Sequence, residues 1–586
     1  MRTGILASRG LLLLVVLAGG TTARAADAPA KPPPPIVVDA HGKGDVTTVA
    51  EALSRVEGGS RILLRAGVYA ETILVTKPVE IFGDGKPGSA RVETDGASAV
   101  QCAADGVRLT GIAFVTRATE GITPAPAVEI VSGDAVLTDC SIASPGPSGL
   151  LVLGKDARAE LSRCAIAGCG TDGIVAEDGA TLACTGCDVD GSNGAGVRAA
   201  RGASVTLKGG RVRGCAGGGL LAHDGGTARA ESCTFTANGI GQLRCTEGGS
   251  RLTAVKCEVR EGLKYGLIVE AGGKIVVEGG EIARNAKSGV LALGAGARSP
   301  LRGVNLHHGK ESGVFVDGGA QAMLDDCDVH HHELVGVDVA GASVFEMVRC
   351  RLHDQVKGGG CVVREKSRGA LDDCEIYGNR DANVWAWKGG VATVRRCTIR
   401  DAGQTGAISD EEGRLVLEDC KFLRNGDGAL WVNPGGLLVV SGSSLAGGPG
   451  WGIYVQEKGT AKLERCAVPG FAKGGVGVVG GGQLDMTECA VKGSSAAGLV
   501  FYDNAKGTVT AGEISGHGTV GVEVLDGAEP VLRRVKIQKN KYAGVRVSRL
   551  GRGTFEKCEL TGNGAGGAWV VADPATVERT GNRPNK

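Results

Sequence analysis

The sequence of 586 residues has no excess of charge of either sign, because 65 lysines and arginines stand against 64 aspartates and glutamates. This balance gives nucleic-acid binding no electrostatic basis, since such proteins carry a basic patch or stripe. Beyond the N-terminus there is no apolar run long enough for a membrane helix. Glycine is abundant, with 100 residues, but lacks the three-residue period of collagen. Aromatic residues amount to only 3%, so any clustering of them is informative.

A motif with a small or apolar residue, most often cysteine, followed two positions later by an apolar residue recurs every 23 or 24 residues. A period of this length is typical of a solenoid, in which each repeat forms one coil. The unbroken array favours one elongated domain over the several that the chain length suggests. The repeated position, position zero below, is occupied by Cys140, Cys164, Cys187, Gly210, Cys233, Cys257, Gly280, Val304, Cys327, Cys350, Cys374, Cys397, Cys420, Ser443, Cys466, Cys489, Gly512, Val535 and Cys558.

The N-terminus has the features of a secretory signal peptide. Arg2 and Arg9 form a short basic region before an apolar run from Leu11 to Leu17, and Ala23–Ala25 forms an A-x-A cleavage site. The apolar run is too short to span a bilayer. We therefore expect cleavage after Ala25 and a secreted or periplasmic mature chain without a membrane span.

The rest of the chain divides simply. Asp45 to Val56 is predicted to form a short amphipathic helix that caps the array, with Thr48 and Glu51 at capping-box spacing. The predicted segments are a signal peptide at 1–25, a Pro-rich linker at 26–36, the repeat array at 37–575 and a polar C-terminal tail at 576–586.

Thirteen of the nineteen cysteines occupy position zero of the repeat. Cysteines in exported proteins usually form disulfides, and stacked coils place their Cα atoms about 4.8 Å apart. Directly stacked Cβ atoms, however, are poorly angled for a disulfide. We expect reduced, packed thiols, with disulfides as the alternative; both roles are structural.

Each coil carries apolar residues at positions −3, 0 and +2, a polar turn with asparagine near +5, and a Gly-Val-x-Val strand at +9 to +12. Alternation within each short run places one set of side chains inward and the other outward. Three runs separated by bends predict an all-β fold. This fold is a single-stranded right-handed parallel β-helix of about 22 coils and roughly 100 Å length, given ~4.8 Å per coil.

Three segments, Thr47–Leu53, Gly67–Glu71 and Ile81–Gly85, resemble the start of pectin-lyase-like right-handed β-helices, especially pectin esterases. The later repeats resemble the β-helix repeats of carbohydrate-binding proteins and sugar hydrolases. The resemblance implies the fold, and a polysaccharide ligand on the sheet that follows the variable turn. The esterase signatures Gln-Asp-Thr-Leu and Asp-Phe-Ile-Phe-Gly are absent. Gly516–Gly518 is similar to a polygalacturonase motif, but the coil before it, near Ser494, lacks the acidic pair that glycoside hydrolysis needs.

Position +11 is expected to face outward and is aromatic in five coils, while +13 adds two more aromatic residues. Exposed aromatic rows suit the apolar C–H faces of sugar rings, and polar residues at +13 suit the hydroxyl groups. The alternatives are ring stacking that stabilises a β surface, and a patch that a partner covers. The predicted ligand-binding residues are Phe315, Trp385, Trp387, Trp431, Tyr454, Tyr502 and Trp569.

Six of the nine histidines lie between positions 307 and 353, mostly at +3 and +4 of three successive coils. Imidazole and carboxylate groups suit zinc, copper or nickel. The alternative is a stacked polar turn without a metal. No cofactor is otherwise expected, so a divalent metal here would be the exception. The candidate metal ligands are His307, His308, His330, His331, His332, His353 and Asp354.

The leading functional prediction is an exported, non-catalytic rod that binds polysaccharide or a cell-surface component through the aromatic sheet. The first alternative is a polysaccharide lyase or glycoside hydrolase with an atypical site, whose candidate residues are Asp317, Asp338, Arg364 and Lys388. The second alternative is a periplasmic metal-binding accessory protein that uses the histidine cluster.

Overall fold

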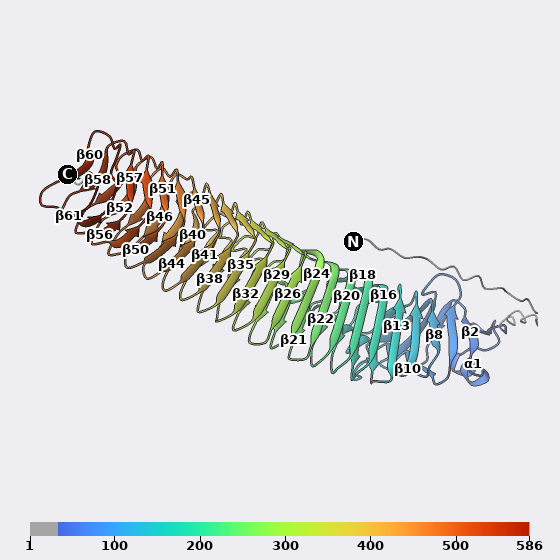
Figure 1. Cartoon of the computed structure of the whole chain (residues 1–586). Coiled ribbons are helices and arrows are strands. Elements are labelled where there is room, and N and C mark those ends of the chain that lie inside the picture. The colour runs from blue at the N-terminus through green and yellow to red at the C-terminus, as the bar shows by residue number, and fades with distance from the viewer. Residues whose placement is uncertain (1–32, 585–586) are drawn as a thin grey trace, which may run out of the picture.

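The computed structural model describes residues 33–584, so the predicted signal peptide and most of the linker lie outside the described residues. The described chain winds into one rod of stacked coils, with strands in about 55% of the chain (Figure 1). There are about 24 turns, close to the 22 predicted. The prediction of a right-handed parallel β-helix is confirmed.

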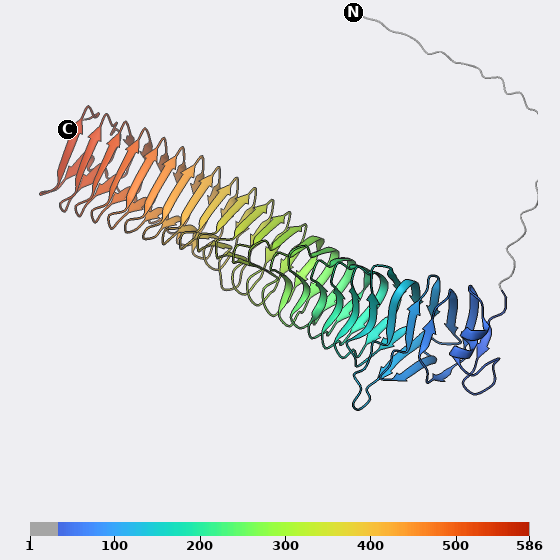
Figure 2. The ribbon, with the colours of Figure 1, turned by 90° about the horizontal axis from the view of Figure 1, so that it is seen from below.

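The coil around Cys374 illustrates the three faces. Strand β35 (Arg368–Asp372) forms face 1, β36 (Glu375–Tyr377) forms face 2, and β37 (Val384–Ala386) forms face 3. Each strand pairs in parallel with the equivalent strands of the coils before and after it. Equivalent strands therefore run side by side along the rod (Figure 2).

The core is a continuous column of inward side chains. In this coil Leu371, Cys374, Ile376, Val384 and Ala386 are each at most 2% exposed. Burial of a Val, Leu or Ile side chain contributes about 1.5–3 kcal/mol, so repetition along the rod provides most of the favourable free energy of folding. The outward positions alternate with these and are mainly polar.

The corner between faces 1 and 2 contains a ladder of thiols. The residue before position zero has a positive φ, such as 52° at Arg349 and 53° at Asp373, which bends the chain sharply. The N–H of Cys350 donates to Sγ of Cys374 in the next coil (3.5 Å), while the Cys350 thiol donates to the carbonyl oxygen of Val348 (3.1 Å). Ser443 substitutes its hydroxyl for the thiol, accepting from the N–H of Cys420 at 3.0 Å.

All nineteen cysteines are buried free thiols, so the expectation of reduced side chains is confirmed. Their role differs from the simple apolar packing that the sequence indicated. The thiols of Cys187, Cys350, Cys374, Cys397 and Cys489 accept from corner N–H groups that would otherwise be buried without an acceptor.

The turn between faces 2 and 3 contains a second ladder, of buried amide side chains at position +5. Asn238 is fully buried; its Oδ1 accepts from the N–H of Cys215 (2.9 Å) and its Nδ2 donates to the carbonyl oxygen of Val212 (3.0 Å). These asparagines were predicted to lie in a polar turn. The structure places them in that turn, with their side chains buried in its interior.

The two ends of the array differ. Helix α1 (Val49–Arg55) lies at the N-terminal end (Figure 1), so the predicted capping helix exists but begins four residues after Asp45. The Thr48 side chain accepts from the N–H of Glu51 and caps the helix there. At the other end, β61 (Thr576–Thr580) pairs in parallel with β59 (Arg552–Glu556). The array thus continues past residue 575, and the start of the segment predicted as a polar tail is its last strand.

Substitution Asn238→Ala should lower the stability of the rod. It leaves the buried N–H of Cys215 without its acceptor, which costs about 1–3 kcal/mol, and removes the hydrogen bond to the Val212 carbonyl. We expect a lower thermal midpoint by circular dichroism and faster hydrogen exchange at the Cys215 amide. Asn193→Ala, at an exposed position of the same residue type, is the control. Equal effects of the two variants would contradict the ladder.

Candidate functional site

Aromatic side chains occupy the outward side of face 3 in the C-terminal half of the rod. Trp385, Trp431 and Tyr454 lie in one outward column, with Ile408 between the two tryptophans. The three aromatic rings are half-buried. Neighbouring members are one or two strand spacings apart, at about 4.8 Å per spacing. The sequence-based placement of these three residues is therefore correct.

Trp451 also belongs to this surface, although the sequence analysis missed it. Its ring lies over two glycines of the next coil, since a Cβ on Gly474 would come within 2.3 Å of the ring and one on Gly477 within 3.1 Å. The ring centroids of Trp451 and Trp431 are 5.5 and 5.8 Å from that of Tyr454. The paired glycines after Trp451 are the signal that could have revealed it.

Two further rings widen the surface. Trp387 stacks on Trp385 with centroids 5.4 Å apart, and the hydroxyl groups of Tyr454 and Tyr502 are 3.5 Å apart. We call the resulting set the aromatic stripe; it consists of Trp385, Trp387, Trp431, Trp451, Tyr454 and Tyr502.

Two predicted members lie elsewhere. Trp569 pairs with Val545, an inward position, and its ring packs edge-on against Phe555 at 5.1 Å, so its assignment to the outward surface was wrong. The turn before Trp569 is one residue longer than in most coils, which shifts the register by one and reverses the side chain. Phe315 does face outward on face 3, but Asp338 and Val362 separate it from the stripe.

The indole nitrogens are directed away from solvent. In the part of the chain that the structure describes, Nε1 of Trp385 and Nε1 of Trp431 are buried and have no hydrogen-bond acceptor. The solvent-facing part of these two rings is therefore carbon, which suits contact with an apolar surface.

The candidate catalytic residues near the rings are engaged in contacts within the chain. Arg364 donates to both carboxylate oxygens of Asp338, at 3.0 and 3.2 Å. Burial raises the pKa of Asp338, although the hydrogen bonds from Arg364 oppose the shift. Asp317 accepts from the N–H of Gly318 (2.7 Å), and the Lys388 ammonium lies 4.2 Å from a Trp387 ring centroid. The predicted catalytic candidates thus already contact neighbouring groups within the chain.

The histidines form stacked columns on face 2. The rings of His307, His330 and His353 lie 5.0 and 5.1 Å apart and nearly parallel, and Tyr377 continues the stack at 4.5 Å. The Arg400 guanidinium covers the Tyr377 ring at 3.9 Å. In-register stacking of successive coils therefore places identical side chains directly above one another.

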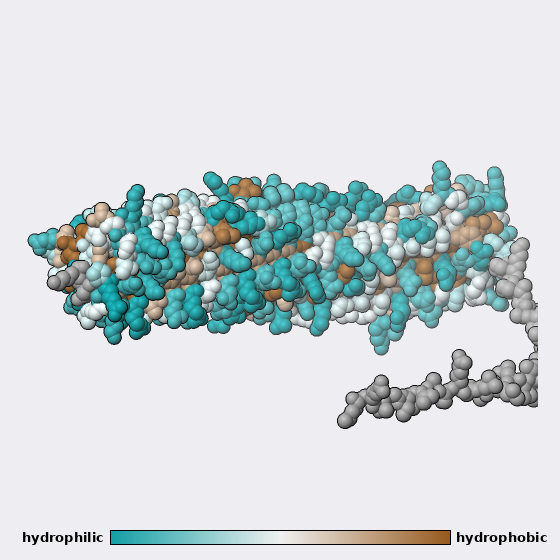
Figure 3. Space-filling model, turned by 45° about the horizontal axis from the view of Figure 1, so that its top comes forward, coloured by the Kyte–Doolittle hydropathy of each residue, from teal (hydrophilic) through white to brown (hydrophobic). Residues whose placement is uncertain are grey.

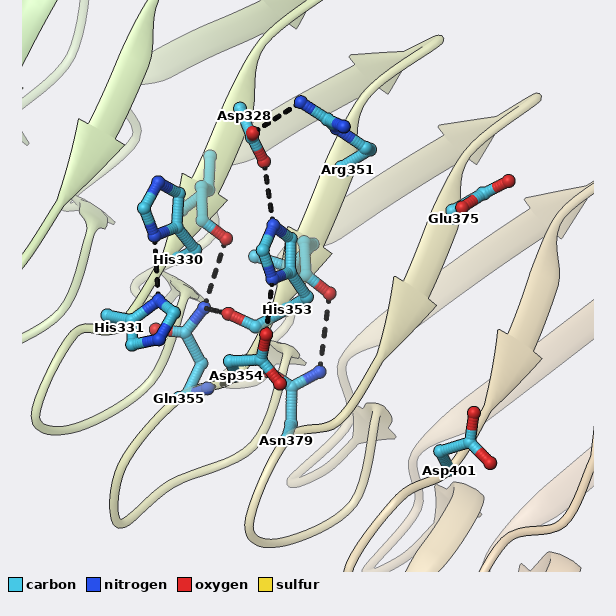
Figure 4. Close-up of polar contacts among 12 residues, drawn as sticks. Asp328, His330, His331, Arg351, His353, Asp354, Gln355, Glu375, Asn379 and Asp401 are labelled. Carbon is cyan, nitrogen blue, oxygen red and sulfur yellow. Dashed lines mark hydrogen bonds and ion pairs between the residues drawn. The ribbon is translucent and has the colours of Figure 1, made fainter.

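Each of these histidines is held at both ring nitrogens. Nδ1 contacts the next residue along the chain at 2.7 Å in all three coils, the partners being His308, His331 and Asp354. His308 and His331 stack in turn, 5.1 Å apart. Figure 4 shows the His330–His331 and His353–Asp354 contacts.

Side-chain oxygens of the preceding coil hold the Nε2 atoms. The partners are Glu281 (2.7 Å), Asn305 (3.0 Å) and Asp328 (2.9 Å), in chain order. Burial lowers the pKa of His330 to about 4. Burial also opposes the charge on His353, but hydrogen bonds to two carboxylates outweigh it and raise its pKa.

His332 lies apart from the other histidines. It is fully buried in the amide ladder, where Nδ1 accepts from the N–H of Gly309 (3.1 Å) and Nε2 lies 3.1 Å from the carbonyl oxygen of Leu306. Parallel stacked rings direct their nitrogen lone pairs side by side, so they do not converge on one point. Within residues 33–584, no three His, Cys, Asp or Glu side chains are arranged to hold a metal ion. Six of the predicted metal ligands therefore belong to a stacked polar turn, and the seventh, His332, belongs to the amide ladder.

Comparison with known proteins identifies the architecture. Residues 124–256, 245–387, 335–445 and 428–583 match the family described as the right-handed beta helix region. The chain belongs to this family. The expected resemblance to pectin-lyase-like β-helices is thereby confirmed for the fold. No curated protein matches the chain. Within the described residues of this β-helix protein, no helix has the length and hydropathy needed to cross a membrane.

Several solved structures match this chain at low identity. The A-module of an Azotobacter vinelandii mannuronan C-5 epimerase is 14% identical; the match covers 56% of this chain and 88% of that one, with a TM-score of 0.30. A PL6 family alginate lyase is 10% identical over 91% and 98%, with a TM-score of 0.33. A pectate lyase is 11% identical over 44% and 69%, with a TM-score of 0.28. Likenesses this low carry no argument about activity.

The two histidines in the amide ladder should make the rod less stable in acid. Burial lowers the pKa of His332 to about 3 and that of His517 to about 4. The unfolded chain binds these protons below about pH 6.5, so stability is complete above that pH and falls by about 1.4 kcal/mol per histidine per pH unit as the pH drops towards 4.

The variant His332→Asn/His517→Asn provides the measurement, because asparagine is the usual residue at these positions and keeps the ladder. Denaturant unfolding at a series of pH values should show a shallower loss of stability between pH 6.5 and 4 than in the unsubstituted protein. An unchanged acid dependence would contradict the assignment of these imidazoles as buried neutral groups.

Proposed function

We propose that this β-helix protein is an exported, non-catalytic rod that binds a polysaccharide chain along the aromatic stripe. The observation that carries the proposal is the concentration of four of the five tryptophans on one side of face 3. A surface of this kind is unusual in a chain with 3% aromatic residues. Large exposed apolar patches on otherwise polar proteins mark binding sites.

The geometry of the stripe fits a sugar chain that runs along the rod. Trp431, Trp451 and Tyr454 form a contiguous group, and glycines beneath Trp451 allow its ring to lie close to the sheet. Ring faces and edges bury the C–H faces of sugars, which removes apolar surface from water. Asn433, which donates to the Asp410 carboxylate at 3.1 Å, supplies polar atoms beside the rings. This mixture matches the amphipathic surface of a polysaccharide.

A lyase or hydrolase is the alternative for the region from Asp317 to Lys388. The bidentate Asp338–Arg364 pair supports a structural role for this carboxylate, since catalysis of glycosidic cleavage requires a separate acid and base. Release of unsaturated or reducing sugars from a polysaccharide would favour the alternative. Export, and a divalent metal at the histidine columns, stay predictions of the sequence.

The variant Trp385→Ala/Trp431→Ala should lose affinity for the polysaccharide that the unsubstituted protein binds on a glycan array. Each half-buried ring contributes about 1–2 kcal/mol through buried area and specific contact, so the expected loss is about tenfold or more. Titration calorimetry with the selected glycan measures the change.

The control for this variant is Val68→Ala/Leu74→Ala, which removes exposed apolar side chains near the N-terminal end of the rod. It should leave the affinity for that glycan within about twofold, because surface substitutions away from a site usually change free energies by less than ~0.5 kcal/mol. Equal losses in both variants, or no glycan binding by the unsubstituted protein, would contradict the proposal.

A further inference from the structure

A shallow groove runs along face 1, away from the aromatic stripe. It consists of two adjoining hollows of about 190 and 460 Å³, which share Val344 and Glu346 in their lining. The first hollow begins at Lys274 and the second ends at Arg414. The groove crosses seven successive strands: β24 (Lys274–Ala283), β26 (Arg298–Arg302), β29 (Gln321–Asp325), β32 (Val344–Val348), β35, β38 (Val391–Arg395) and β41 (Arg414–Glu418).

Short and apolar outward side chains create the floor of this groove. Met323 and Val344 are 42% and 37% exposed, and Pro300, Ala370 and Thr393 line the same hollows. On the face of the rod drawn in Figure 3, hydrophilic side chains predominate and apolar groups appear as scattered patches. An apolar floor open to water is a candidate binding surface.

Basic side chains line the groove along one outward column, at position −6 of successive coils. Lys274, Arg298, Arg368 and Arg414 belong to this column, and across residues 33–584 none of them forms an ion pair with another side chain. Glu346 is the one carboxylate in the lining, and no ion pair involves it either.

Arginines at position −2 of the same face have partners. Arg302 pairs with Asp325 at 3.6 Å, and Arg395 donates to Glu418 at 2.8 Å. Four cations against one carboxylate in the groove therefore leave an unpartnered positive field, which attracts anionic ligands.

We propose that this groove binds a linear acidic polysaccharide, whose carboxylate or sulfate groups pair with the basic column and whose rings lie on the apolar floor. Six strand spacings of about 4.8 Å separate Lys274 from Arg414, so the groove accommodates roughly 29 Å of extended chain. Guanidinium groups match carboxylates and sulfates in two-pronged hydrogen bonds.

A polysaccharide fits better than an acidic peptide. Face 1 is the interior of a continuous parallel sheet, in which strands such as β32 pair on both sides. Its backbone donors and acceptors are used, so an extended peptide finds no free strand edge to pair with. This surface offers two kinds of contact instead. Met323 and Val344 can pack against the faces of sugar rings, and the basic column can pair with the anionic groups of the sugar.

The site is independent of the proposed function, because it lies on another face and acts through charge. A charge-reversal variant, Arg298→Glu/Arg368→Glu/Arg414→Glu, tests it in the full chain. Its matched control, Arg158→Glu/Lys506→Glu/Arg552→Glu, changes the net charge equally at exposed position −6 outside the groove. The probes are alginate and heparin, with dextran as a neutral polymer and polyglutamate as an acidic peptide.

The unsubstituted protein should bind alginate or heparin at about 20 mM salt and lose affinity strongly at about 300 mM, where the Debye length is shorter than ~10 Å. Charge reversal in the groove should weaken binding by about tenfold or more, and the control variant by less than about twofold. Trp385→Ala/Trp431→Ala should leave this salt-sensitive binding intact.

Three results would overturn the proposal. These are equal losses in the groove and control variants, absence of binding to both acidic polysaccharides, and polyglutamate binding as tight as that of the sugars. None of them bears on the ring contacts that Trp385→Ala/Trp431→Ala removes from the aromatic stripe, so failure of one site is distinguishable from failure of the other.

Discussion

In-register pairing of parallel strands every 23 or 24 residues is the constraint on which the rest of the structure depends. It converts a one-dimensional repeat into columns, because each position of a coil lies about 4.8 Å from its equivalents above and below. Columns decide which side chains are buried. They also bring Trp431 and Tyr454, 23 residues apart in sequence, into one surface.

The corners of the coil show how this register satisfies buried polar groups. At one corner a thiol or hydroxyl accepts from the N–H of the coil before it, and at another an asparagine amide does so. His332 and His517 replace asparagine because an imidazole offers an acceptor and a donor at comparable positions. This structural requirement, and not a ligand, accounts for these two histidines.

Periodicity in the sequence was sufficient to predict the three faces, the buried cysteines and the outward direction of Trp385, Trp431 and Tyr454. Turn length was the information that it lacked. One added residue before Trp569 reverses that side chain, and no propensity distinguishes the longer turn from its neighbours. Trp451 was missed because its strand begins earlier than the Gly-Val-x-Val pattern suggested. The groove on face 1 depends on side-chain lengths in adjacent columns and on which arginines find partners, and neither follows from the repeat.

Two separate surfaces on one rod would allow it to hold two polymer chains, one by ring contacts on face 3 and one by charge on face 1. Both surfaces exist only if the coils stack in register. Spin labels introduced as non-canonical amino acids at Arg298 and Glu529, ten strand pairings apart in one outward column, test this directly by double electron–electron resonance. A narrow distribution centred near 48 Å is expected, from ten spacings of about 4.8 Å. A broad distribution, or one centred well below that distance, would contradict the stacked rod.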